Sequence, residues 1–348
     1  MLTSYKAEDV TMLLKDITGL VQPLENSERE KFIQSGVHYS EMIPAEHLPT
    51  EQYMRTFNSA LDNFSLPTAQ AAKLLAKKIV EDKGKDVVLV SLARAGTPIG
   101  IILKHFIQRM YSFDPPHYTI SIIRGKGIDK NAVNYILERH IPESICFIDG
   151  WTGKGAIKHQ LDEAMKDFPR INPEVCVLSD PAFVSGKCGT HEDFLIPSSC
   201  LNSTVSGLIS RTFFRPDIIG ENDFHGALYH EKFKDYDMSY MFIERTEVNF
   251  DKEYHFTEPS GTVFPLDEVK AIAEKYKVRD INFIKPGIGE ATRVLLRRIP
   301  FAVLVSSKND EKRLGHIYRL AEEKNVPVIE YPLVNYRACG IIRDISDS

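Results

Sequence analysis

The sequence predicts a two-part α/β protein, in which a parallel sheet covered by helices is followed by a smaller α/β unit. The first observation is that short apolar or β-branched runs alternate with segments of helical periodicity between residues 51 and 178. The second is that this alternation stops near residue 183 and restarts at residue 266. The restarted part is about 85 residues long, which is enough for a core of its own.

Buried strands are expected at the apolar runs, and helices where apolar residues recur every three or four positions. In the first unit, the expected strands are 87–91, 118–123, 144–148 and 174–178, and the expected helices are 51–64, 67–82, 99–110, 132–140 and 156–167. In the second unit, they are strands 280–284, 301–305 and 326–331 and helices 266–277, 289–298 and 311–324. We therefore expect a first domain at 1–245, with an irregular N-terminal extension and a hood or insert at 183–245, then a polar linker at 246–261 and a second domain at 262–348.

Composition places the chain among globular proteins, with 43% hydrophobic and 26% charged residues. No run of about 20 apolar residues occurs, so no membrane span or membrane partner is expected. The N-terminus lacks the basic-then-apolar pattern of a signal peptide. The five cysteines of the chain are scattered and odd in number, which favours reduced thiols and a cytoplasmic protein.

Three Gly-rich loops follow three of the expected strands, at 91–96, 124–127 and 149–155. Parallel sheets bind ligands at the carboxyl ends of their strands, small residues let the backbone approach an anion, and N–H groups at a helix start bind phosphate. The charged residues in these loops are Arg94, Arg124, Lys126, Asp149 and Lys154. The loops therefore predict a site for a sugar phosphate or nucleotide.

These motifs carry a family resemblance. Ile145–Ile157 resembles the phosphoribosyl-pyrophosphate loop of type I phosphoribosyltransferases, and Ser91-Leu-Ala-Arg-Ala-Gly96 resembles their pyrophosphate loop. With Ile123-Arg-Gly-Lys-Gly-Ile-Asp129 and Ser206-Gly-Leu-Ile-Ser-Arg-Thr212, they make residues 30–345 similar to the two-domain phosphoribosyltransferase–Pelota proteins of tellurite-resistance and stress-response gene clusters, which are also labelled cysteine protease StiP. Gly150 departs from the pattern, because the loop usually has a second acid there.

The resemblance implies a phosphoribosyltransferase that uses phosphoribosyl pyrophosphate, or a related phosphorylated ribosyl compound, with Mg²⁺ to make a nucleoside-like compound linked to stress or metal resistance. It implies that Asp149 orients the ribose and that Arg124 and Lys126 close over the leaving group. The substrate-binding residues that it implies are Ser91, Arg94, Ala95, Gly96, Gly150, Thr152, Gly153, Lys154, Gly155, Ser206 and Arg211. No side chain is expected to ligate a metal directly.

The second unit is similar to the Pelota and ribosomal-L7Ae-like RNA-binding fold. Lys285-Pro-Gly-Ile-Gly-Glu-Ala-Thr-Arg293 lies where that fold has its Gly-rich turn and helix start, although Gly289 replaces the usual Asn. The resemblance implies contacts with RNA phosphates. The RNA-binding residues expected here are Lys285, Glu290, Arg293, Arg297 and Arg298. A solvated helix face that only packs the domain is the alternative.

Two other functions stay open. One is a binding module without catalysis, which senses a nucleotide and docks on RNA through its second unit. The other, given less weight, is a cysteine protease or hydrolase, which the label of the family implies and for which Cys188 is the thiol to test; no flanking pattern supports a Cys–His dyad. Cys188-Gly-Thr-His191 has half the spacing of a zinc site, but no second pair of ligands follows it. The partners that the sequence allows are a small phosphorylated substrate, RNA and a second copy of the chain.

Overall fold

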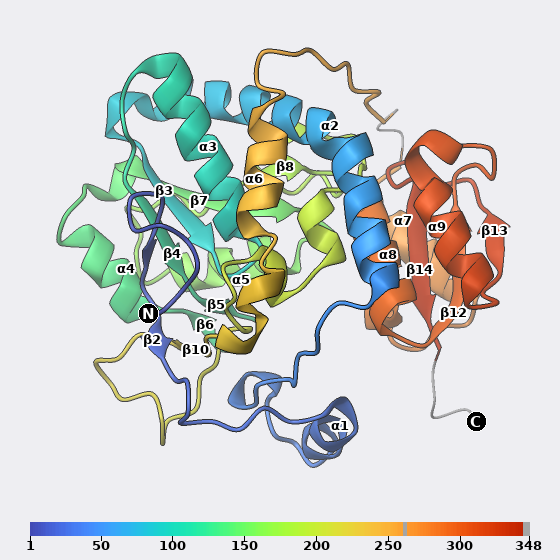
Figure 1. Cartoon of the computed structure of the whole chain (residues 1–348), viewed down its shortest axis with the longest axis horizontal. Helices are drawn as coiled ribbons and strands as arrows, with labels where there is room; N and C mark the ends of the chain where they lie inside the picture. Colours follow the sequence, from blue (N-terminus) through green and yellow to red (C-terminus); the bar gives the residue numbers. More distant parts are fainter. Residues whose placement is uncertain (260–262, 344–348) are drawn as a thin grey trace.

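The computed structural model describes residues 1–259 and 263–343, and it contains a large α/β unit beside a small one (Figure 1). The large unit is built on a six-stranded sheet in the order β1-β4-β3-β7-β8-β9, and every neighbouring pair is parallel. Its strands are β1 (Thr11–Met12), β4 (His117–Ile120), β3 (Val88–Leu92), β7 (Ile145–Trp151), β8 (Val175–Ser179) and β9 (Lys187–Thr190). This confirms the parallel α/β sheet.

Helices cover both faces of this sheet, because alternate side chains of each strand point to opposite sides. Leu89, Ile148 and Cys176 pack in one core cluster with α2 (Glu51–Lys83), α3 (Gly96–Tyr111) and α6 (Ser239–Glu247). Val90 and Phe147 pack in a second cluster with α4 (Lys130–Leu137) and α5 (Ala156–Met165). The strands are buried on both faces, which explains why they are continuous apolar runs in the sequence.

One long helix, α2, replaces the two helices expected at 51–64 and 67–82. Proline has no N–H and its ring crowds the preceding turn, so Pro67 predicts a break. On either side of it, Ser65 and Thr68 donate their hydroxyls to the carbonyls of Leu61 and Phe64, at 2.6 and 2.7 Å, as additional bonds within the helix. Pro67 is buried in the helix, and the packing of α2 against the sheet outweighs the local cost of the proline.

The N-terminal extension and the insert are more ordered than the sequence predicts. The extension forms β1, β2 (Lys15–Asp16) and α1 (Asn26–Gln34), and β2 pairs with β10 (Gly226–Ala227) from the insert. The strand expected at 118–123 splits into β4 and β5 (Ile122–Ile123), which pairs with β6 (Gly127–Ile128). Short 3₁₀ helices span Tyr39–Glu41, Gly84–Asp86, Pro142–Ser144, Pro197–Cys200, Ser203–Val205 and Glu231–Tyr236.

The small unit has a four-stranded mixed sheet in the order β11-β14-β12-β13. Its elements are α7 (Pro265–Lys275), β11 (Ile284–Pro286), α8 (Ile288–Arg297), β12 (Pro300–Val305), α9 (Glu311–Glu323), β13 (Val328–Glu330) and β14 (Ala338–Ile342). The strand expected at 280–284 was misplaced, because Asp280 caps a 3₁₀ turn at Ile281–Phe283 and β11 begins only afterwards. The central strand β14 was not predicted.

The two units share one hydrophobic core. Phe57 and Phe64 of α2 belong to the same buried cluster as Ile288, Leu295 and Val303 of the small unit. Figure 1 shows the small unit beside the first half of α2. The expected linker at 246–261 begins within α6, and its residues 260 and 261 lie outside the described residues. Within the described ranges, no helix has both the length and the apolar character to cross a bilayer.

Candidate functional site

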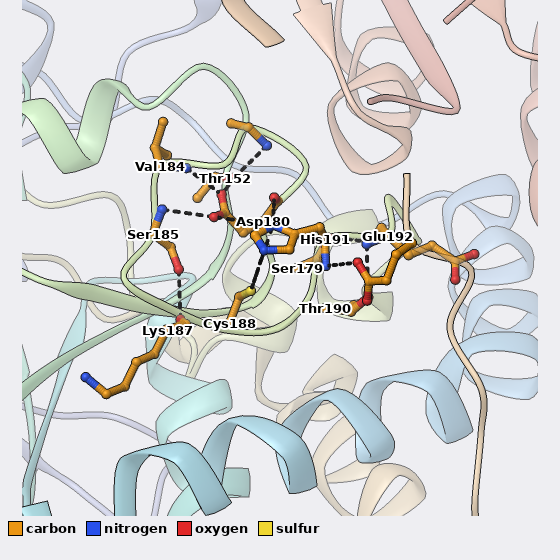
Figure 2. Close-up of polar contacts among 12 residues, drawn as sticks. Thr152, Ser179, Asp180, Val184, Ser185, Lys187, Cys188, Thr190, His191 and Glu192 are labelled. Carbon is orange, nitrogen blue, oxygen red and sulfur yellow. Dashed lines mark hydrogen bonds and ion pairs between the residues drawn. The ribbon is translucent and has the colours of Figure 1, made fainter. Parts of the chain in front are cut away.

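A thiol, an imidazole and a carboxylate meet at the carboxyl edge of the main sheet (Figure 2). Asp180 follows β8 directly, Cys188 lies on β9, and His191 follows β9. The two strands are parallel neighbours, so their ends lie side by side. The ligand-type atoms of the three side chains all lie within 4.8 Å of one another.

Hydrogen bonding fixes the tautomer of His191. Its Nδ1 lies 2.8 Å from the carbonyl oxygen of Asp180. A carbonyl only accepts hydrogen bonds, so Nδ1 carries the ring proton in the neutral imidazole and Nε2 is left as an acceptor. The Cys188 Sγ lies 3.6 Å from Nε2 and 4.0 Å from Nδ1. The sulfur thus lies beside the ring, nearly as close to Nδ1 as to Nε2, and the imidazole must turn before the thiol proton can pass to Nε2.

The carboxylate of Asp180 is held rigidly under this pair. Its side chain is fully buried and accepts from the Thr152 hydroxyl at 2.5 Å and from the Val184 and Ser185 N–H groups at 3.2 and 2.9 Å. Burial raises the pKa of Asp180, and these hydrogen bonds oppose the shift. One carboxylate oxygen lies 3.7 Å from the Nδ1 of His191, where it stabilises positive charge on the ring.

Cys188 is a neutral thiol at rest. Its residue is only 5% exposed, and burial, together with the nearby Asp180 charge, raises its pKa to about 11. The His191 side chain is 33% exposed and stacks on Phe183, with ring centroids 4.0 Å apart. Phe183 has φ 53°, in the left-handed region that a bulky residue rarely adopts, and such strain gathers at functional sites. The imidazole is thus the solvent-facing side of the pair.

Neighbouring elements fix the strand that carries the thiol. A side chain at Gly189 would put its Cβ 2.4 Å from the carbonyl oxygen of Ala71 in α2, so glycine lets β9 pack directly on the helix. Lys78 of α2 donates to the Cys188 carbonyl at 2.8 Å. Glu258, from the segment before the small unit, accepts from the His191 N–H at 2.9 Å.

The other four cysteines are free and buried in the core. Cys146 and Cys176 face each other across β7 and β8, with their sulfurs 3.2 Å apart. Among the described residues, Cys188 is the cysteine whose sulfur contacts an imidazole. This contact distinguishes it as the candidate nucleophile.

Residues 3–247 match the family described as "Tellurite-like stress resistance cysteine protease StiP", and residues 264–344 match the "PELOTA RNA binding domain". A protein of Acinetobacter baylyi named "Cysteine protease StiP" is 36% identical over 367 residues, which cover 98% of this chain and 94% of the relative. The chain belongs to the StiP family. The predicted kinship with tellurite-type stress resistance and the Pelota match of the second unit are thereby confirmed.

The predicted phosphoribosyltransferase activity is wrong for this StiP-family chain, because both the family and the relative are named as cysteine proteases. Two residues of the predicted pyrophosphate loop are packed inside the protein. Ser91 is fully buried and its hydroxyl contacts the Gly96 carbonyl and the His117 ring. Gly96 serves close packing, because a Cβ there would lie 2.3 Å from the Ile148 carbonyl oxygen of β7. The expectation of Mg²⁺ depended on a pyrophosphate substrate and loses that support.

Other predicted substrate residues are held by internal bonds. Arg94 forms an ion pair with the buried Glu46 at 2.7 Å. Lys154 donates to the carbonyls of Ile281 and Ile284 in the small unit, at 2.6 and 3.1 Å. Ser206 donates to the Asn202 carbonyl at 2.9 Å, and Lys126 forms an ion pair with Glu41 at 3.4 Å. Arg211, by contrast, is exposed. These roles in ligand binding stay predictions.

The structure does bring many predicted residues of both units to one cavity of about 260 Å³ between them. The predicted residues that line it are Ala95, Arg124, Asp149, Thr152, Gly153, Lys154, Gly155, Lys285, Glu290 and Arg293. Burial raises the pKa of Asp149 to about 6 and lowers that of Lys154 to about 8. Gly150 follows Asp149 on β7 and donates its N–H to that carboxylate at 2.8 Å.

Two of the arginines expected to bind RNA form contacts between the units, and their role toward RNA stays a prediction. Arg293 and Arg297 donate to the carbonyl of Ser199, at 3.3 and 3.2 Å, and Arg297 also donates to that of Leu201. The Arg293 guanidinium lies 4.7 Å from the centre of the Trp151 ring. Arg298 is exposed.

Cys188 and His191 stood out in the sequence as half of a zinc spacing. The sequence did not predict that Asp180 lies beside them. Asp180 comes from the end of another strand, eight positions before the thiol. Only the pairing of β8 with β9 brings the carboxylate under the imidazole. The polar strand Lys187-Cys-Gly-Thr190 has no apolar alternation that would have predicted that pairing.

Proposed function

We propose that the protein is a thiol-dependent hydrolase of the peptidase type. Cys188 is the nucleophile, His191 the general base and Asp180 the residue that orients and stabilises the imidazolium. The observation that carries the proposal is the 3.6 Å contact between Cys188 Sγ and His191 Nε2, with the tautomer set by the Asp180 carbonyl. The family and the name of the relative support the same class.

The chemistry follows that of a base-assisted nucleophile. His191 Nε2 takes the thiol proton as Sγ attacks the substrate carbonyl carbon, because the buried thiol is neutral at rest. The imidazolium then gives that proton to the leaving amine, and a thioester to Cys188 remains. Water attacks the thioester carbon while His191 takes its proton, the acid product leaves, and the proton returns to the sulfur. Asp180 stabilises the imidazolium in both halves.

Peptide hydrolysis by the wild-type protein and its variants tests this mechanism. A mixture of denatured-protein peptides is incubated with the full chain, and new N-termini are identified by mass spectrometry. We expect Cys188→Ser and His191→Asn to lower the cleavage rate by at least about 1,000-fold. Asp180→Asn should lower kcat while leaving KM within about twofold, because the carboxylate acts through His191.

Cys200→Ser is the matched control, because Cys200 is also buried but faces no imidazole in the described structure. It should keep wild-type cleavage. Full activity in Cys188→Ser would overturn the assignment of the nucleophile. The absence of any cleavage by the wild-type protein, with no acyl-thioester trapped at Cys188, would overturn the hydrolase.

A second function is supported by the match of residues 264–344, and we propose that the small unit binds RNA. Arg298 is exposed at the end of α8, whereas Arg297 is held by carbonyls of the large unit. Arg298→Gln should therefore weaken RNA binding by the full chain and reduce its salt dependence, because phosphate contacts release counterions. Arg297→Gln serves as the control for loss of charge. Retention on filters that ignores both salt and Arg298→Gln would remove the RNA role.

A further inference from the structure

We propose that Asp180, Cys188 and His191 also bind a thiophilic divalent cation, best fitted by Zn²⁺, and that the bound ion switches the thiol off. The three side chains offer one carboxylate oxygen, one sulfur and one ring nitrogen within 4.8 Å of one another. The ion-binding part stands on this geometry alone. Only its inhibitory consequence rests on the proposed function.

The spacing of the donor atoms suits a tetrahedral ion. Zinc binds thiolate sulfur at about 2.3 Å and imidazole nitrogen at about 2.0 Å, so the two atoms are about 3.5 Å apart around a tetrahedral centre. Cys188 Sγ and His191 Nε2 are already 3.6 Å apart. The imidazole must turn for Nε2 to face the ion, because the sulfur lies nearly as close to Nδ1, at 4.0 Å, and the Asp180 carboxylate lies 3.7 Å from Nδ1.

The donor set selects the metal. Thiolate and imidazole ligands favour Zn²⁺ and related borderline or soft cations, whereas Mg²⁺ and Ca²⁺ require oxygen ligands. Asp180 supplies one anionic oxygen, and a deprotonated Cys188 supplies a second negative charge. Two anionic ligands and one neutral ligand leave a dipositive ion neutralised within a largely buried site.

Groups behind the ligands hold them in the required orientation. Metal-binding histidines generally donate their second ring N–H to a carbonyl or carboxylate. His191 does so through Nδ1 to the Asp180 carbonyl, which leaves Nε2 free as a ligand. The Asp180 carboxylate is in turn fixed by the Thr152 hydroxyl and by two backbone N–H groups, at Val184 and Ser185 (Figure 2).

The fourth position of the ion faces outward. His191 is one-third exposed, whereas Asp180 and Cys188 are buried, so water reaches the ion from the imidazole side. On binding, the S–H bond of Cys188 breaks, its proton passes to solvent, and the sulfur lone pair bonds the ion without any change of oxidation state. The sulfur and the base nitrogen are then both occupied, so peptide hydrolysis stops.

Cobalt substitution tests the site without reference to activity. Co²⁺ is titrated into the metal-free full-length chain, and the thiolate-to-cobalt charge-transfer band and the visible bands of tetrahedral Co²⁺ are recorded. We expect both in the wild-type protein and their displacement by Zn²⁺. Cys188→Ser should lose the charge-transfer band with an affinity loss on the order of 100-fold, and Thr152→Val should weaken binding by about tenfold. Cys200→Ser should behave as wild type.

Protection of the thiol provides a second measurement that needs no variant. Iodoacetamide labelling of Cys188, followed by mass spectrometry, should slow at least tenfold with one equivalent of Zn²⁺ and recover with a chelator. No charge-transfer band in the wild-type protein, or the same band in Cys188→Ser, would overturn the metal site. Zn²⁺ that binds without slowing alkylation or peptide cleavage would overturn the switch. If the proposed hydrolase function is wrong, the metal-free protein will not cleave peptides, whatever the result of the metal titration.

Discussion

Thr152→Val removes the hydroxyl that donates to the buried Asp180 carboxylate and changes the side-chain shape little. The 2.5 Å bond joins a neutral donor to a charged acceptor, and such bonds contribute about 1.5–3 kcal/mol. Asp180 is fully buried, so water cannot replace the lost donor. We expect about 2 kcal/mol of destabilisation, which for a chain of 348 residues corresponds to a fall in Tm of roughly 3 °C.

Thermal unfolding at pH 8 measures this change, with circular dichroism confirming the fold at 20 °C. The matched control is Thr246→Val, because Thr246 is also buried but its hydroxyl donates to the neutral carbonyl of Phe242 at 2.9 Å. That variant should lose about 1 kcal/mol or less. If Thr152→Val costs no more than Thr246→Val, the carboxylate is not the charged, fully bonded group on which the site depends.

Two further predictions concern the supports of the fold. Gly189→Ala should destabilise the protein by about 1–3 kcal/mol, because the new Cβ would overlap the Ala71 carbonyl. Gly153→Ala is the control, because nothing in the described part of the chain lies near that position, and it should change Tm by less than about 2 °C. Equal Tm values in the two variants would contradict the packing argument. Although burial opposes it, Arg94 holds the pKa of Glu46 at about 2, below its ordinary 4.5, so this stabilisation is complete above about pH 4.5 and is lost as the pH falls toward 2. Glu46→Gln should lower the free energy of unfolding at pH 7 by up to about 3 kcal/mol and make it depend less on pH between pH 4.5 and 2. The same pH dependence in the variant and the wild-type protein would show that the ion pair with Arg94 contributes nothing.

The strands of the main sheet could be predicted because each is buried on both faces. Val88–Leu92 and Val175–Ser179 are therefore mostly apolar and needed no knowledge of their neighbours. Where tertiary packing overrides a local signal, the prediction failed. Pro67 marks a helix break by its own chemistry, yet it lies inside α2 because that helix packs against the small unit in its first half and against the large unit further along.

The site was less accessible to sequence reasoning because its contacts are long-range. The loop around Asp149 does line a cavity, as the run of strand, acid and glycines indicates. The partners of its neighbours are not encoded locally: Arg94 pairs with Glu46, which precedes it by 48 positions, and Lys154 donates to carbonyls 127 and 130 positions later. These long-range partners of Arg94 and Lys154 could not be read from the local motif.

The length of α2 has a mechanical consequence. Its 33 residues form a rod of about 50 Å, whose first turn donates through the Tyr53 hydroxyl to the Leu296 carbonyl of the small unit. Further along the helix, Ala71 packs against β9 and Lys78 donates a hydrogen bond to the Cys188 carbonyl. A displacement of the small unit along this rod reaches the strand of the thiol without passing through the sheet. Any ligand that displaces the small unit would then share one coupling free energy with the reactivity of Cys188, and each would report on the other.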